Sequence, residues 1–227
     1  MRNLVVITGA GMSAESGIKT FRDHNGLWEE HNVEDVATPE GWKRNPELVN
    51  KFYNERRKQL LECNPNLGHK LIAELEENFN VNIITQNIDN LHERAGSTNV
   101  LHLHGELNKV RSSIDENDIM KLTGWELKIG DKCKRGSQLR PHIVWFGETV
   151  PEIDNAVPLV MNADIIIIVG TSMAVYPAAG LVNYSSYNCP IFLIDPNIPD
   201  KYIKNVSYIQ KGASEGIKEL KEKLAYI

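Results

Sequence analysis

Four polar side chains in the middle of the chain have the types needed for chemistry at a ribose. Gln86, Asn87 and Asp89 follow one short apolar run, and His104 follows the next. Amides and a carboxylate can hold a carboxamide and ribose hydroxyls, and a neutral imidazole can take a hydroxyl proton near neutral pH. Each residue also has a structural explanation, because Asn and Asp commonly cap helices and a single histidine is most often structural. Their convergence favours a ligand site.

A glycine-rich turn near the start of the sequence could hold the phosphates of such a ligand. The run Val5 to Thr8 predicts a buried strand, and Gly9, Gly11 and Ala14 follow it in the pattern GxGxxA. In this pattern Gly9 permits a tight turn, Gly11 lets the backbone approach a pyrophosphate, and Ala14 allows close packing of a helix. Many such turns bind nothing, so the pattern alone leaves both interpretations open.

Short apolar runs that end in polar residues indicate the strands that position these side chains. The runs lie at 81–85, 100–103, 143–146, 165–169 and 191–194, with helical stretches at 90–96 and 177–186. Runs buried on both faces predict a mostly parallel sheet, hence an α/β fold. Ligands of such sheets bind at the carboxyl ends of the strands. The polar residues at those ends are Gln86, Asn87, Asp89, His104, Thr171, Ser172 and Asp195.

Helices and one insertion complete the predicted organisation. Helices are expected from Pro46 to about Leu61, over 68–78, and over 213–224 as a solvated amphipathic helix. Residues 106–140 hold no strong strand and predict a small inserted module, with apolar contacts from Ile119, Leu122, Trp125 and Ile129.

Composition and charge limit the class of protein. A net charge of −5 from 25 basic and 30 acidic residues argues against a nucleic-acid partner. Three cysteines in no paired pattern suit a reducing compartment. The first residues do not resemble a signal peptide, and no apolar run approaches membrane-spanning length. We therefore expect a cytoplasmic protein without membrane association, and a monomer.

Five motifs together resemble the sirtuin family. They are GAGMSAESGIKTFR (9–22), TQNIDNLHERAG (85–96), HGEL (104–107), LRPHIVWFGE (139–148) and GTS (170–172). The resemblance implies a Rossmann-like large domain over 1–24, 67–105 and 140–227, and a small domain from two insertions over 25–66 and 106–139. It also explains why no second strand follows Arg22, because 18–28 would then be a mobile loop that closes over the cofactor.

The resemblance implies NAD-consuming removal of acyl groups from lysine side chains of proteins. In that reaction the acyl oxygen attacks C1′ of the nicotinamide ribose and nicotinamide leaves. A histidine then activates a ribose hydroxyl, which attacks the imidate carbon. By position His104 would be that base, and Asn87 would order the ribose and the reacting centre.

The resemblance also implies which residues hold NAD. Gln86 would hold a ribose hydroxyl, Asp89 with the Ile88 backbone would hold the carboxamide, and Arg22 would contact a phosphate. The residues expected to bind NAD are Gly9, Ala10, Gly11, Ala14, Phe21, Arg22, Gln86, Asn87, Ile88, Asp89, Gly170, Thr171, Ser172, Asp195 and Ala213.

We expect one helix to bind the acyl group and a stretch of backbone to bind the substrate peptide. Tyr53 and Arg56 lie three apart on the helix from Pro46, hence on one face, and look like the Tyr-x-x-Arg pair of class III sirtuins, which prefer succinyl and malonyl groups. By the same alignment Val33 stands where a small residue leaves room for the acyl group. The alternative is that Tyr53 lies on the surface and Arg56 is solvated, with no part in substrate binding. The substrate peptide would add a strand beside Val144, Trp145, Phe146 and Gly147.

One departure from the family concerns zinc. Sirtuins usually hold a structural zinc between two Cys-x-x-Cys pairs, but this module offers only Cys133, with Ser112, Ser113 and Gly136 near the other ligand positions. We therefore predict no zinc and no other metal.

Other functions stay open at this point. The chain could be a general NAD-dependent deacetylase in which Arg56 points elsewhere, or a non-catalytic module that binds NAD or ADP-ribose. An ADP-ribosyl transferase uses the same first step with another nucleophile.

Overall fold

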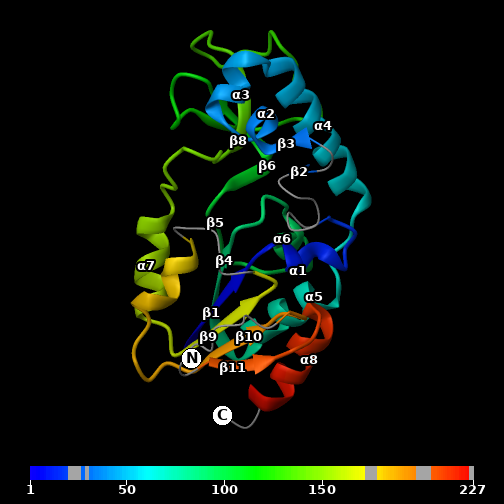
Figure 1. The fold of residues 1–227 in the computed structure, drawn as a ribbon. Coiled ribbons are helices and arrows are strands. Elements are labelled where there is room, and N and C mark those ends of the chain that lie inside the picture. The colour runs from blue at the N-terminus through cyan, green and yellow to red at the C-terminus, as the bar shows by residue number, and fades with distance from the viewer. Residues whose placement is uncertain (20–26, 29–30, 172–177, 198–205, 225–227) are drawn as a thin grey trace.

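The computed structural model describes the chain except for residues 20–26, 29–30, 172–177, 198–205 and 225–227. Its centre is a parallel sheet of six strands in the order β11-β10-β9-β1-β4-β5 (Figure 1). This confirms the expected α/β fold with a Rossmann-like parallel sheet. The strands are β1 (Arg2–Thr8), β4 (Phe79–Thr85), β5 (Val100–His102), β9 (Ile165–Val169), β10 (Ile191–Ile194) and β11 (Val206–Ile209).

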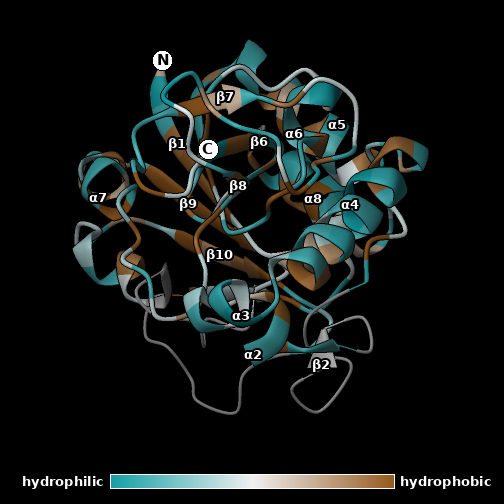
Figure 2. Cartoon of the chain, turned by 90° about the horizontal axis from the view of Figure 1, so that it is seen from above, coloured by the Kyte–Doolittle hydropathy of each residue, from teal (hydrophilic) through white to brown (hydrophobic). Residues whose placement is uncertain are grey.

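Helical elements cover both faces of this sheet, which is why its central strands are continuous apolar runs (Figures 1 and 2). Side chains alternate along β1, so that Leu4 and Val6 pack into one layer and Val5 and Ile7 into the other. The first layer contains α5 (Leu67–Glu74), the 3₁₀ turn η2 (Leu75–Glu77) and α8 (Ala213–Leu224). The second contains α7 (Ile153–Met161) and the 3₁₀ helix η3 (Ala178–Tyr184).

A smaller group of elements lies beyond the carboxyl ends of the parallel strands, at the top of Figure 1. An antiparallel sheet has the order β7-β6-β8, and α4 starts where the Asn45 side chain accepts a hydrogen bond from the Leu48 N–H. The elements are β2 (Leu27–Trp28), β3 (His31–Asn32), α2 (Val33–Val36), α3 (Pro39–Arg44), α4 (Pro46–Glu62), β6 (Gly105–Ser112), β7 (Ile119–Lys121) and β8 (Leu139–Ile143). Two short helices, α1 (Ala10–Ala14) and α6 (Leu91–Ala95), follow β1 and β4.

The structure corrects the prediction of a main-sheet strand over 143–146. β8 ends at Ile143 and pairs antiparallel with β6 in the small sheet, and 144–146 belong to no strand. An apolar run carries no information about which sheet it joins, which explains the error.

The module over 106–140 also differs from its prediction. It contains the strand β6, which the sequence did not predict. The strand carries polar residues at buried positions, Arg111 and Ser112, and so shows no apolar run. Its apolar centre is not the predicted set: Ile119 and Ile129 are exposed, and only Leu122 of the four packs against the actual centre. The buried residues there are Val110, Leu127, Cys133 and Leu139. The boundaries between the two domains stay a prediction. None of the described helices is long and apolar enough to cross a bilayer.

Candidate active site

A cavity of about 710 Å³, the edge cavity, lies where the carboxyl ends of β1, β4, β9 and β10 meet α4 and the segment after β8. Its wall includes the residues expected to bind NAD that the structure describes: Gly9, Ala10, Gly11, Ala14, Gln86, Asn87, Ile88, Asp89, Gly170, Thr171, Asp195 and Ala213. His104 and the residues expected to hold the substrate, Tyr53, Arg56, Val144, Trp145, Phe146 and Gly147, line the same cavity. Phe21, Arg22, Ser172 and most of the predicted loop at 18–28 lie outside the described residues.

The glycine-rich turn makes a close approach between two strand ends. A Cβ at Gly11 would lie 2.6 Å from the Cα of Gly170, and one at Gly9 would lie 2.8 Å from the Gly170 carbonyl oxygen. The Gly11 N–H donates to that same oxygen at 2.9 Å. The close approach that the pattern predicts is therefore an approach of backbone to backbone. Contact of Gly11 with a pyrophosphate stays a prediction.

Hydrogen bonds fix Asn87 on two sides. Its backbone N–H donates to Thr85 Oγ1 at 3.0 Å, and its Nδ2 donates to the Gly9 carbonyl at 3.0 Å and to Ser13 Oγ at 3.1 Å. Because both amide protons are used inside the protein, Oδ1 is the side-chain atom left to contact a ligand. An amide oxygen only accepts hydrogen bonds, so it suits a hydroxyl donor.

Asp89 is held by the same serine. Its Oδ2 accepts from Ser13 Oγ at 2.9 Å, and its Oδ1 accepts from the Leu91 N–H at 3.0 Å. Burial raises the pKa of Asp89, and these hydrogen bonds oppose the shift. Ser13 thus joins the two polar residues of the turn after β4.

His104 has the protonation that a general base needs. Its Nδ1 lies 3.0 Å from the Gln86 carbonyl oxygen. A carbonyl only accepts, so Nδ1 carries the proton and Nε2 keeps its lone pair. Burial lowers the pKa of His104, and the hydrogen bond to Gln86 only partly opposes this. The ring is therefore neutral near pH 7 and can accept a proton at Nε2.

The other histidine of this segment, His102, has a different role. It is buried, its Nδ1 donates to the Asn87 carbonyl at 3.0 Å, and its Nε2 lies 2.7 Å from Glu93 Oε1. Burial lowers its pKa, but the carboxylate of Glu93 outweighs burial and the net shift is upward. His102, Glu93 and Glu106 bring possible metal ligands within 4.8 Å of one another. His102 pairs with Glu93, and Glu106 pairs with Lys109. The group is therefore best described as a cluster of ion pairs.

Two further contacts order neighbouring strand ends. Gln86 Nε2 donates to Thr171 Oγ1 at 3.2 Å, joining the ends of β4 and β9. Asp195 is buried, and its Oδ1 accepts from the Asn197 N–H at 2.8 Å, which shapes the turn after β10. Contact of these residues with ribose or adenosine stays a prediction.

Tyr53 and Arg56 lie on the side of α4 that lines the edge cavity. Tyr53 is fully buried and its hydroxyl oxygen accepts a hydrogen bond from Trp145 Nε1 at 3.0 Å. Burial raises the pKa of Tyr53 above its usual value, so the phenol stays protonated. Ala37 also lines the cavity and Val33 does not, so the part of Val33 in leaving room for the acyl group stays a prediction.

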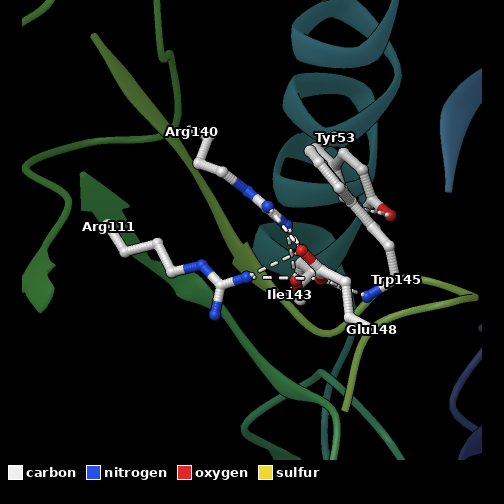
Figure 3. Close-up of polar contacts among 6 residues, drawn as sticks. All are labelled: Tyr53, Arg111, Arg140, Ile143, Trp145 and Glu148. Carbon is white, nitrogen blue, oxygen red and sulfur yellow. Dashed lines mark hydrogen bonds and ion pairs between the residues drawn. The ribbon is translucent and has the colours of Figure 1, made fainter. Parts of the chain in front are cut away.

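A partly buried ion-pair network holds the segment after β8 (Figure 3). The Glu148 carboxylate accepts from Arg140 Nη1 at 2.7 Å, from Arg111 Nη2 at 3.1 Å and from the Trp145 backbone N–H at 2.8 Å. Arg140 also donates to the Ile143 carbonyl at 3.0 Å. Because Arg111 lies in β6 and Arg140 in β8, this network ties the segment to the small sheet.

The backbone of this segment is largely engaged within the protein. The N–H of Val144 donates to the His104 carbonyl at 3.0 Å, and that of Phe146 to the Ala37 carbonyl at 2.9 Å. With the Trp145 N–H on Glu148, three donors of the segment are used. Pairing with a substrate peptide stays a prediction and has to use other groups of 144–147.

Several residues of the cavity wall were missed from the sequence, among them Ser13, Ala37 and Glu148. Ser13 lies inside the glycine pattern at 9–14, and Glu148 ends the motif at 139–148, so both had a positional signal. Ala37 had none, because only the packing of α2 brings it to the cavity.

The residues of the small module do not fit a structural zinc. Cys133 Sγ lies 3.0 Å from Ser137 Oγ, which lies 2.7 Å from Ser112 Oγ. One thiol with two hydroxyls does not supply the four nitrogen or sulfur ligands that such a site requires. The absence of zinc from this protein stays a prediction.

A parallel sheet with a cavity at its carboxyl edge, and a neutral imidazole in that cavity, define a Rossmann-like α/β protein with a ligand site in the position usual for such sheets. The chain belongs to the Sir2 family, whose model matches residues 9–177. It is similar to the NAD-dependent protein deacylase of Bacteroides thetaiotaomicron, with 59% identity over 230 residues that cover 99% of this chain and 98% of that protein.

Solved structures agree with this membership. The crystal structure of a Sir2 homolog–NAD complex has a TM-score of 0.85 at 41% identity and covers 98% of this chain and 89% of that chain. A Sir2 protein with a deacetylated p53 peptide and 3′-O-acetyl-ADP-ribose has a TM-score of 0.79 at 30% identity and covers 98% of this chain and 93% of that chain.

Proposed function

We propose that this chain is an NAD-dependent protein lysine deacylase that favours acidic acyl groups, succinyl and malonyl, over acetyl. It releases nicotinamide and O-acyl-ADP-ribose. The coarser part of this statement, protein deacylation with NAD as co-substrate, rests on membership of the Sir2 family and on relatives named for that activity. The preference for acidic acyl groups is our own proposal.

One observation carries that preference. Tyr53 and Arg56 line the same cavity as Asn87 and His104. A phenol and a guanidinium in one cavity match a carboxylate, because both donate hydrogen bonds and Arg adds a positive charge. An acetyl group offers no partner for either side chain. The favoured substrates are therefore acyl groups that end in a carboxylate.

Asn87, His104 and Ser13 have different roles in the proposed reaction. NAD supplies the ribose that receives the acyl group. Asn87 orders a ribose hydroxyl through Oδ1, because its own protons are already bonded. His104 accepts the proton of the attacking hydroxyl at Nε2, because its Nδ1 proton is held by the Gln86 carbonyl. Ser13 holds Asn87 and Asp89 in place.

A panel of acyl-lysine peptides tests the proposal, with nicotinamide release and deacylated peptide measured together. We expect kcat/KM for succinyl-lysine to exceed that for acetyl-lysine on the same peptide. Arg56→Met should lower the succinyl value about tenfold to a hundredfold, the loss expected for a charged hydrogen-bonding partner, and change the acetyl value little. His104→Tyr should abolish both.

Arg44→Met is the matched control, because Arg44 is an exposed arginine paired with Asp35 and does not line the edge cavity. It should leave the ratio of the two rates unchanged. Faster acetyl than succinyl turnover by the wild-type protein would reject the acidic preference and favour a general deacetylase. NAD binding without nicotinamide release on any acyl peptide would favour a non-catalytic binding module.

We also propose that the protein acts as a cytoplasmic monomer without nucleic-acid or membrane partners. Support comes from the acidic net charge of −5 and from three free, buried cysteines. Light scattering at micromolar concentration checks the oligomeric state.

A further inference from the structure

The turn after β4 has a hydrogen-bond partner for each backbone group of its first two residues. The N–H groups of Gln86 and Asn87 donate to β1 and β4, at 2.9 and 3.0 Å. Their carbonyl oxygens lie 3.0 Å from Nδ1 of His104 and of His102, respectively. This one turn therefore carries Asn87 and also orients the ring of His104.

His102 reaches the turn because of its place in the sheet. It is the last residue of β5 and pairs with Thr85, the last residue of β4. Its ring is buried, and its Nε2 lies 2.7 Å from Oε1 of Glu93, which stands in α6. The ring thus bridges the turn and the helix that follows it.

The two partners of His102 fix its protonation. A backbone carbonyl and a carboxylate only accept hydrogen bonds, whereas a neutral imidazole has a single N–H. A ring with an acceptor at each nitrogen therefore carries both protons. Burial lowers the pKa of His102 and raises that of Glu93, but their mutual contact outweighs burial in both groups. The second proton lies on the ring.

The charges around this ring agree with a cation. Other titratable groups that interact with it are Asp89 before α6, His92 in α6, and Glu106 in β6, which pairs with Lys109. The two carboxylates favour the charged ring. His92 adds no charge, because burial holds its pKa well below the usual value.

We propose that Glu93 and His102 are positioning residues, in which the carboxylate keeps the ring doubly protonated so that its Nδ1–H fixes the Asn87 carbonyl. Neither residue lines the edge cavity, so both act through the turn and not on a ligand. The inference rests on the proposed roles of Asn87 and His104, whose positions the turn sets.

Substitution of His102 tests the donor to Asn87. His102→Leu removes it, so kcat for the acyl peptide that the wild-type protein turns over fastest should fall about tenfold to a hundredfold. His102→Asn should recover most of this loss, because an asparagine Nδ2 stands as many bonds from the backbone as the histidine Nδ1. KM for NAD should change little in both variants, since His102 does not touch the cavity.

Glu93→Gln tests the carboxylate with little risk to folding, because the Glu93 side chain is 38% exposed. The amide has the same size but no charge to hold the second proton, so kcat should fall about five- to tenfold, the effect of one hydrogen bond. Glu76→Gln is the matched control. Glu76 likewise accepts two hydrogen bonds, both from Thr98, and does not line the cavity, so kcat should stay unchanged.

Nitrogen NMR of protein with isotope-labelled histidine reads the state of the ring directly, with the His102 signals assigned by their loss in His102→Asn. At pH 7 both ring nitrogens of His102 should be protonated in the wild type, and only one in Glu93→Gln. A neutral His102 ring in the wild type would overturn the inference, as would equal kcat values for His102→Leu and His102→Asn.

The outcomes separate this inference from the proposed function. A wild-type protein that deacylates no peptide, or a fully active His104→Tyr variant, would reject the proposed function. An active wild type that His104→Tyr inactivates, together with wild-type kcat in His102→Leu and Glu93→Gln, would reject the positioning role alone.

Discussion

His102 and His104 show how environment assigns different work to the same residue type. Both donate a ring proton from Nδ1 to a backbone carbonyl, that of Asn87 or Gln86. The difference lies at Nε2, which faces the Glu93 carboxylate in His102. The pKa of His102 is raised and that of His104 is lowered. One ring therefore holds the backbone of the turn after β4, and the other has a free lone pair at Nε2 that suits the predicted base.

The lowered pKa of His104 predicts the pH dependence of deacylation. Only the neutral ring can accept a proton, so activity is lost as the pH falls through the pKa of His104, which lies below 6.5 because of burial. We expect kcat/KM for the acyl peptide to be flat between pH 7 and 8 and to fall on an acid limb below about 6.5. The measurement is a pH profile of deacylated peptide. An acid limb centred above pH 7 would contradict this assignment.

At the scale of elements, the packing of α5 and α6 against the central strands places two neutral histidines under the site. His69 of α5 and His92 of α6 are both buried, with ring centroids 4.8 Å apart. Thr8 donates its hydroxyl proton to Thr85, so His92 Nε2, 3.1 Å away, donates to Thr8. Burial lowers the pKa of His69 to about 4 and that of His92 well below its usual value.

This pair predicts a loss of stability in mild acid. The pKa of each histidine in the folded protein lies below its value of about 6.5 in the unfolded chain. The histidines therefore contribute fully to the free energy of unfolding above pH 6.5, and this contribution is lost as the pH falls below that value. For His69 the free energy of unfolding should drop on the order of 2 kcal/mol between pH 7 and pH 5. Urea unfolding at the two pH values measures it.

His69→Phe supplies the comparison, because it fills a similar volume and cannot take up a proton. The variant should lose less free energy of unfolding between pH 7 and pH 5 than the wild type. Equal losses in the two proteins would show that the histidine does not carry the effect.

At the scale of the whole molecule, the small sheet is held without a ligand set for metal. Its apolar centre includes Leu127, Cys133 and Leu139, and its Arg111 and Arg140 are paired with Glu148 in the segment after β8. We predict that apolar packing and this ion-pair network stabilise the small sheet without a structural zinc.

This arrangement predicts a protein that is indifferent to chelators. Elemental analysis of the purified protein should find well under one zinc per chain, and excess EDTA should leave both the melting temperature and the deacylation rate unchanged. About one zinc per chain, or a fall in melting temperature with EDTA, would contradict the prediction.

Much of the fold and of the candidate site could be predicted from the sequence, because the patterns that indicate them are made by residues that are neighbours in the chain. The strand–glycine–helix pattern at 5–14, the polar residues after β4 and β5, and the apolar runs of β9 and β10 each depend on neighbours along the chain. The α/β class follows from these runs, because strands apolar on both faces require helices on both faces. The motifs that mark the Sir2 family are equally local.

Only the tertiary structure decided which groups meet and in which state. No local pattern tells that 139–143 joins β6 rather than the parallel sheet, or that Ala37 lines the cavity. Burial and distant partners set the protonation of His104 and His102. These depend on contacts between residues far apart in sequence, and such contacts exist only once the chain is packed.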